Sequence, residues 1–163
     1  MAQIISFIGT SGVGKTTHLE KVIREFKKRG YKIAVVKHHM HDFEIDKPGK
    51  DTWRHAQAGA DTVVLSSPTK IATIEKITQE KTLDEIAASL QEVDIVITEG
   101  FKKENKPKVE ILRKAHSTEV ISRSEELIAL VTDCDIASHA PRFAFDEVEQ
   151  LVDFLVTKFI KSF

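Results

Sequence analysis

The stretch Gly9-Thr10-Ser11-Gly12-Val13-Gly14-Lys15-Thr16 decides the fold of this 163-residue chain. It matches the pattern G-x-x-x-x-G-K-[ST], the P-loop or Walker A motif, in which glycines let consecutive backbone N–H groups converge on phosphate oxygens. In such a loop we expect Lys15 to place its ammonium on the terminal phosphates and Thr16 to ligate Mg²⁺ through its hydroxyl. The alternative is a glycine turn with a coincidental Lys-Thr.

The segments on either side of the loop have the periodicities that the motif needs. Gln3–Gly9 is a β-branched and aromatic run, which is typical of a buried strand. Apolar residues then recur at helical spacing from Leu19 to Phe26, and Gly30 follows a basic cluster that suits the end of a helix. Ile33–Lys37 predicts a second strand, so the chain opens with a βαβ unit whose crossover should be right-handed.

The remainder of the chain continues the alternation of strands and helices. Short apolar runs predict further strands at Thr62–Leu65, Ile71–Ile74, Ile95–Thr98, Val109–Leu112 and Leu127–Thr132. After Asp146, helical spacing predicts a C-terminal amphipathic helix to about Ile160. The pattern favours a three-layer α/β fold, with a largely parallel sheet flanked by helices. We expect residues 1–163 to form a single nucleotide-binding domain.

Composition limits the partners. The net charge is −1, so no long-range field attracts nucleic acid or an anionic membrane surface, and we expect neither as a partner. The longest apolar run, Leu127–Val131, is far shorter than the ~20 residues of a membrane-spanning helix. A single cysteine, Cys134, and the absence of a basic, apolar leader favour the reducing cytoplasm. Any anion-binding function must therefore be local.

An acidic partner for the P-loop follows the strand Ile95–Thr98. Glu99 stands at the carboxyl end of that strand, the edge over which metal and attacking water lie in P-loop sites. Asp94 precedes the strand and would lie at the wrong edge. We therefore predict that Glu99 binds Mg²⁺ together with Thr16, and that Glu99 and Lys15 are the catalytic residues. An ordinary turn at Glu99 is the alternative.

Two further segments resemble a known family. Val36–Thr52, with the sequence VKHHMHDFEIDKPGKDT, and Glu99–Lys102, with the sequence EGFK, are similar to the molybdopterin-guanine dinucleotide biosynthesis adapter proteins, the MobB family. With the P-loop, the similarity extends from the first strand to the terminal helix. It implies a P-loop NTPase of molybdenum cofactor biosynthesis that binds GTP with Mg²⁺, hydrolyses it weakly at best and forms homodimers. It also implies a partner, the enzyme that attaches GMP to molybdopterin.

The resemblance also implies which residues contact the nucleotide. On this sequence they are Gly12, Val13, Gly14, Lys15, Thr16, Thr17, Glu99, Gly100 and Lys102. Ser66 and Ser67 are added because they follow the predicted strand Thr62–Leu65, which would place them at the same edge of the sheet.

The guanine-reading residues are less well defined. Asn105–Lys108 reads Asn-Lys-Pro-Lys and lacks the acid of the Asn-Lys-x-Asp motif, so guanine preference is an implication of the resemblance. Asp133 and Asp135 follow the strand Leu127–Thr132. A carboxylate there could accept the N1 and N2 protons of guanine, or it could cap a turn.

Two polar segments allow more than one interpretation. His38, His39 and His41 lie close in sequence, but neighbouring side chains point to opposite sides and zinc needs three or four ligands, so we favour a polar wall of the active site over a metal centre. The segment Lys102–Lys114 carries six basic and two acidic residues. It is either a solvated face or an anion-attracting rim beside the nucleotide.

Two other function classes compete with the adapter. In a small-molecule kinase, Glu99 or Asp42 would act as base for a substrate hydroxyl, but the sequence lacks the arginine cluster of a lid that closes over phosphates. In a pure scaffold, the nucleotide would only stabilise the fold and the dimer.

Overall fold

The computed structural model describes residues 2–160, which fold into two compact units. The P-loop body comprises the described parts of Met1–His38 and Leu83–Phe163, and the hairpin unit comprises His39–Thr82. The body is therefore built from two segments of the chain that are separated in sequence by the hairpin unit.

A six-stranded parallel sheet forms the centre of the P-loop body. Its strands are β1 (Gln3–Ile8), β2 (Ile33–Lys37), β5 (Ile95–Glu99), β6 (Lys108–Leu112), β7 (Leu127–Thr132) and β8 (Arg142–Phe143). They lie in the order β2-β5-β1-β6-β7-β8, and every neighbouring pair is parallel. The P-loop strand β1 thus lies between β5 and β6, and the carboxyl ends of all six strands share one edge.

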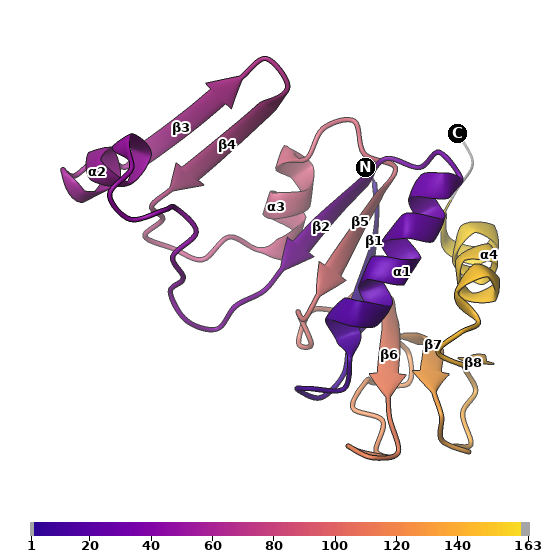
Figure 1. The fold of residues 1–163 in the computed structure, drawn as a ribbon. Coiled ribbons are helices and arrows are strands. Elements are labelled where there is room, and N and C mark those ends of the chain that lie inside the picture. Colours follow the sequence, from indigo (N-terminus) through magenta and orange to yellow (C-terminus); the bar gives the residue numbers. More distant parts are fainter. Residues whose placement is uncertain (1, 161–163) are drawn as a thin grey trace. The chain divides into compact units, whose positions relative to one another are not determined.

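Helices cover both faces of this sheet. They are α1 (Lys15–Lys28), α3 (Leu83–Ser89) and α4 (Val148–Phe159). Phe26 of α1 and Leu155 of α4 share one buried cluster with Phe7 of β1, so α1 and α4 lie side by side on one face (Figure 1). On the other face, Leu83 of α3 packs against Ile4 and Val96. The predicted three-layer α/β fold with a parallel sheet is confirmed.

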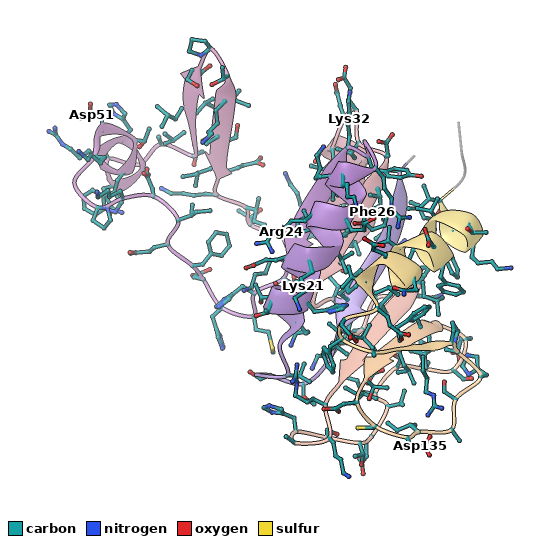
Figure 2. All side chains as sticks on the ribbon, turned by 45° about the vertical axis from the view of Figure 1, so that its right-hand side comes forward. Lys21, Arg24, Phe26, Lys32, Asp51 and Asp135 are labelled. Carbon is teal, nitrogen blue, oxygen red and sulfur yellow. The ribbon has the colours of Figure 1, made fainter. Side chains whose placement is uncertain are left out.

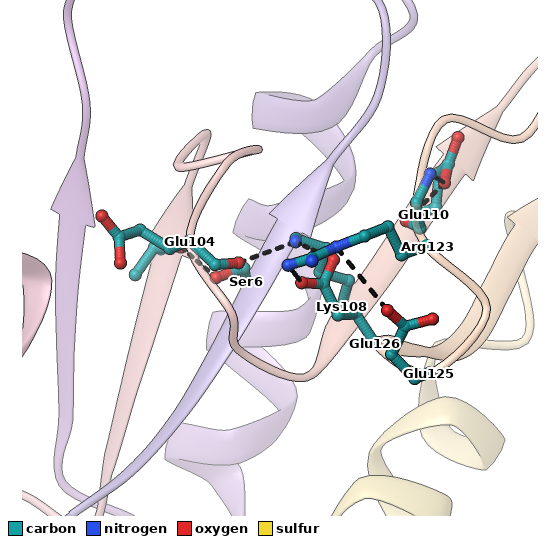
Figure 3. Close-up of polar contacts among 9 residues, drawn as sticks. Ser6, Glu104, Lys108, Glu110, Arg123, Glu125 and Glu126 are labelled. Carbon is teal, nitrogen blue, oxygen red and sulfur yellow. Dashed lines mark hydrogen bonds and ion pairs between the residues drawn. The ribbon is translucent and has the colours of Figure 1, made fainter.

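The connection between β6 and β7 lies over buried charges, and its Val120 packs against Leu112 and Leu130. Lys108 is only 1% exposed and forms an ion pair with Glu126, which also pairs with Arg123 (Figure 3). The Lys108 ammonium also donates to the backbone oxygen of Glu104 at 2.7 Å. Removing two charges from water is costly, and this arrangement is stable only because each charge has close partners.

Glu110 of β6 fixes the same connection from beneath. Its carboxylate accepts hydrogen bonds from the backbone N–H of Ile121 at 2.8 Å and of Ser122 at 2.9 Å, and from the Ser122 hydroxyl at 2.6 Å. Buried carboxylates held by several donors make rigid anchors. The connection therefore has a defined conformation where it leaves β6.

The hairpin unit holds a short helix and two strands. They are α2 (Asp51–Gln57), β3 (Thr62–Ser67) and β4 (Lys70–Glu75), and β3 pairs antiparallel with β4 in a separate two-stranded sheet. Both strands were predicted, but the expectation that they join the main sheet is wrong. Only Pro68 and Thr69 separate them, and a two-residue connection can join only antiparallel neighbours.

A few boundaries differ from the prediction. The C-terminal helix, predicted to follow Asp146, begins at Val148 with Glu147 as its N-cap residue and ends at Phe159. The two-residue strand β8 carries too short a pattern to be predicted. Within residues 2–160, no helix combines the length and apolar character needed to cross a membrane.

Candidate functional site

The P-loop connects β1 to α1 and is fixed by close packing at its first residue. A Cβ on Gly9 would lie 2.5 Å from the carbonyl oxygen of Ile111 in β6, and its φ is +155°, so only glycine fits. Val13 is buried in the core beneath the loop. The N-cap residue of α1 is Gly14, which has no side chain to cap the helix, so the first N–H groups of α1 are available to an anion.

The ammonium of Lys15 lies over the loop backbone. It donates to the carbonyl oxygen of Gly9 at 3.2 Å and of Thr10 at 2.8 Å. Burial lowers the pKa of Lys15, and the nearby positive charge of Lys102 lowers that pKa further. Two cations that repel one another at a helix N-terminus would both be stabilised by a polyanion.

The predicted magnesium ligands are in contact. The Thr16 hydroxyl donates to Glu99 Oε1 at 2.8 Å, and the Lys37 ammonium lies 3.8 Å from the same oxygen. The Glu99 side chain is only 13% exposed. A hydroxyl and a carboxylate are hard oxygen ligands of the kind that Mg²⁺ prefers, so Thr16 and Glu99 could hold this ion together.

The chain turns sharply after Glu99, and the turn explains the Glu-Gly-Phe-Lys sequence. Gly100 has a φ of +100° and donates its N–H to Phe7 of β1 at 3.1 Å. Phe101 also has a positive φ, and its ring centroid lies 4.7 Å from that of His38. This turn directs the chain back so that the Lys102 charge acts on Lys15.

The remaining predicted loop residues lie where the motif requires. Gly12 has a φ of +77° in the middle of the loop, and Thr17 is exposed in the first turn of α1. The structure thus brings the P-loop, Glu99 and Gly100 together at one edge of the sheet.

Ser66 and Ser67 do not belong to that sheet. Both are in β3 of the hairpin unit, where Ser66 pairs with Ile71 and the Ser67 hydroxyl donates to the Lys70 oxygen at 3.1 Å. The sheet-edge reason for predicting them as nucleotide contacts is therefore wrong. In the same unit, His39 Nδ1 lies 2.9 Å from the His41 carbonyl oxygen, and no three His, Cys, Asp or Glu side chains among residues 2–160 gather as metal ligands.

A cavity of about 450 Å³ opens at the carboxyl ends of β7 and β8. Its lining includes Asp133, Asp135 and Phe143. Asp133 accepts the Lys114 N–H at 2.7 Å, and this hydrogen bond lowers the Asp133 pKa. Asp135 accepts from Arg142 at 2.7 Å and lies in the loop after β7 (Figure 2). Because β7 is parallel to β1, this cavity is at the same sheet edge as the P-loop.

Sequence reasoning missed two residues that touch the P-loop. Arg113 Nε donates to the Val13 carbonyl oxygen at 3.4 Å, and a Cβ on Gly12 would lie 3.6 Å from the His116 ring. The sequence position of Arg113 pointed to this edge of the sheet, because Arg113 directly follows β6 and side chains at strand ends meet there.

Known proteins resemble the chain along most of its length. Residues 4–133 match the family described as Molybdopterin guanine dinucleotide synthesis protein B. The Molybdopterin-guanine dinucleotide biosynthesis adapter protein of Haemophilus influenzae is 31% identical over 154 residues, which cover 93% of this chain and 86% of that protein. The Escherichia coli protein of the same name is 32% identical over 162 residues, which cover 96% of this chain and 93% of that protein.

A solved structure shares the fold. The crystal structure of molybdopterin-guanine biosynthesis protein B (mobB) is 34% identical and has a TM-score of 0.74. The match covers 94% of this chain and 97% of that chain.

Proposed function

This chain belongs to the Molybdopterin guanine dinucleotide synthesis protein B family, and on that premise we propose that it is a GTP-binding adapter for the enzyme that attaches GMP to molybdopterin. The adapter role in this biosynthesis follows from the family. The contact of the Thr16 hydroxyl with Glu99, beside the Lys15 ammonium, carries the nucleotide part of the proposal. This contact supports the proposal because a hydroxyl, a carboxylate and an ammonium lie together at the N-terminus of α1.

The phosphates of GTP would bind to the P-loop N–H groups, to Lys15 and to Lys102. Thr16 and Glu99 would hold Mg²⁺, and Glu99 could also orient a water molecule. Attack of that water on the γ-phosphorus breaks the bond to the β–γ bridging oxygen and yields GDP and phosphate. We expect this hydrolysis to be slow, because the Lys15 ammonium is bonded to loop carbonyls and is not preorganised for the charge of the transition state.

Guanine would bind in the cavity beside β7 and β8. A carboxylate there can accept the N1 and N2 protons of guanine in a bidentate fashion, and adenine lacks this pair of donors. Asp135 is better suited than Asp133, because Asp133 already holds the Lys114 backbone and Asp135 needs only to release the exposed Arg142.

A second copy of the chain is the proposed partner of the hairpin unit. An isolated two-stranded sheet is marginally stable in water, and β3 and β4 expose Val64, Leu65 and Ile71. By the strand register, Leu65 lies on one face of the hairpin, and Val64 and Ile71 lie on the other. A homodimer would cover these apolar side chains.

Titration with GTP and ATP in the presence of Mg²⁺ tests the ligand. We expect GTP to bind more tightly, and Asp135→Asn to reduce this preference at least tenfold, because the amide replaces one of the two acceptor oxygens by an NH2 donor that would face a guanine N–H. Equal affinity for both nucleotides would contradict guanine recognition.

Affinity capture with the GMP-transferring enzyme tests the adapter role. We expect a complex that persists on purification, and faster formation of molybdopterin guanine dinucleotide when the adapter is present. Transfer of the γ-phosphoryl group from the nucleotide to a small metabolite would contradict the adapter and support the kinase.

A further inference from the structure

Arg113 contacts the P-loop from the side of β6. Besides the hydrogen bond from Nε to the Val13 oxygen at 3.4 Å, its Nη2 lies 3.6 Å from the position that a Cβ on Gly14 would occupy. The guanidinium carbon lies 4.1 Å from the centre of the Phe145 ring. Arg113 therefore bridges the phosphate loop and the segment between β8 and α4.

The hydrogen bond to Val13 determines where the next N–H points. A peptide group is planar and trans, so its C=O and N–H point in opposite directions. With the Val13 oxygen turned toward Arg113, the N–H of Gly14 is turned away from Arg113. Gly14 has a φ of +97° and no Cβ, so this peptide is among the freest to rotate in the loop. A rotated peptide would present a carbonyl oxygen, instead of an N–H, to a bound phosphate.

Arg113 is itself held in place by its surroundings. Its carbonyl oxygen accepts the N–H of His116 at 2.8 Å and of Ser117 at 3.0 Å, which fixes its backbone in a turn. Phe145 lies against its guanidinium and also packs edge-on against His18, with 5.9 Å between ring centroids. A donor with a fixed side chain and a fixed backbone can orient the peptide without moving.

We propose that Arg113 is a positioning residue, which holds the Val13–Gly14 peptide with its N–H directed toward bound phosphates. The inference rests on the proposed function, since it requires a nucleotide in the P-loop. The effect acts through the donor at Nε, and the positive charge of the side chain is secondary.

The two conservative substitutions of Arg113 separate the donor from the charge. In Arg113→Gln, the amide nitrogen is bonded to Cδ, as Nε is in arginine, so the donor is kept and the charge is lost. In Arg113→Lys, the charge is kept and a carbon replaces Nε. Lys114→Ala is the matched control, because it removes an exposed positive charge at the next position.

The dissociation constants of GTP, GDP and GMP, measured with Mg²⁺ at one ionic strength, are the readout. We expect Arg113→Ala and Arg113→Lys to weaken GTP and GDP about tenfold, the usual effect of losing one hydrogen bond from a charged donor. Arg113→Gln should recover most of this loss, and Lys114→Ala should bind within about twofold of the unaltered chain. GMP, which lacks the outer phosphates, should be affected least.

If Arg113→Lys keeps the affinity for GTP and Arg113→Gln does not, the positive charge is what matters and the proposal is overturned. A loss of affinity in Lys114→Ala as large as in Arg113→Ala would overturn it in the same way. Binding by all Arg113 variants as tight as by the unaltered chain would also overturn it. Failure of the unaltered chain to bind GTP would instead contradict the proposed function. Thermal unfolding without nucleotide checks the fold, and if Arg113→Ala does not fold, the comparison of Arg113→Gln with Arg113→Lys still decides.

Discussion

The P-loop body and the hairpin unit contain similar apolar strands but bury them to very different degrees. Ile95, Val96 and Ile97 of β5 have no exposed surface, whereas Leu65 is 61% and Ile71 is 68% exposed. The body covers its sheet with its own helices, whereas in the hairpin unit Val63 is buried and Val64, Leu65 and Ile71 of β3 and β4 stay exposed. The proposed nucleotide site thus belongs to the unit with the buried core, and the proposed homodimer would cover the apolar side chains that the hairpin unit exposes.

Charged groups differ between the two units in the same way. Lys108 and Glu126 of the body form an ion pair beneath a connection, and Lys81 and Glu75 of the hairpin unit form one at 2.7 Å with both side chains about half exposed. A buried pair that loses one partner leaves an uncompensated charge, and an exposed pair leaves a hydrated one.

Removing the lysine from each pair should therefore lower the free energy of unfolding far more in the body than in the hairpin unit. This is the largest difference that we expect between the two units. We expect Lys108→Ala to lower the free energy of unfolding by about 4 kcal/mol, because Glu126 stays buried without its ammonium partner. Lys81→Ala should cost less than about 1 kcal/mol. Chemical denaturation of both variants measures the difference, and equal losses would contradict the contrast between the units.

Glycines with positive φ offer a second matched pair. Alanine at position 9 would bring a Cβ to 2.5 Å from a backbone oxygen, whereas at Gly49 of the hairpin unit, with a φ of +84°, nothing lies within 4 Å. We expect Gly9→Ala to destabilise the chain by about 3 kcal/mol, from strain and overpacking. Gly49→Ala should cost about 1 kcal/mol from the backbone conformation alone. Similar midpoints for the two variants in thermal unfolding would show that the P-loop is not fixed by β6.

The body should also lose stability in mild acid through one buried histidine. Burial, with a smaller effect of Lys21, lowers the pKa of His18 from 6.5 to about 4. Between these values the unfolded chain binds a proton that the folded chain does not, so stability falls as the pH falls from 6.5 toward 4.

Between pH 7 and pH 5, the lowered pKa of His18 should decrease the free energy of unfolding by about 2 kcal/mol. We expect His18→Leu to lack this part of the pH dependence, which denaturation curves at the two pH values would show. The same decrease in the leucine variant would assign it to other groups.

The smallest effect on the body is expected from a charge placed on the hairpin. Ile71→Lys should convert a dimer to a monomer in sedimentation analysis, because the ammonium would have to be buried in the interface. The affinity for GTP should change less than about twofold, since none of the proposed nucleotide contacts lies in β4. Thr69→Lys adds the same charge in the connection between the strands and should stay dimeric. A monomeric unaltered chain would contradict the proposed homodimer.

Much of the body could be predicted from the sequence because its features are local. The P-loop, its strand and its helix each have a short pattern, and the contact of Thr16 with Glu99 follows from the rule that strand ends meet at one edge. Ser66 and Ser67 were misplaced because the apolar runs of β3 and β5 look alike, and only the two-residue connection to β4 reveals the separate hairpin. The position of Arg113 directly after β6 places it at this edge, but its contact with the P-loop was missed because no local pattern shows that β6 lies next to β1.

The most direct test of the account is the affinity for GTP with Mg²⁺ of the unaltered chain and of Lys15→Ala, measured by titration calorimetry. If the P-loop body binds the triphosphate through Lys15, the unaltered chain binds GTP and the variant binds it about 100-fold more weakly while remaining folded. Unchanged affinity in Lys15→Ala would contradict the account.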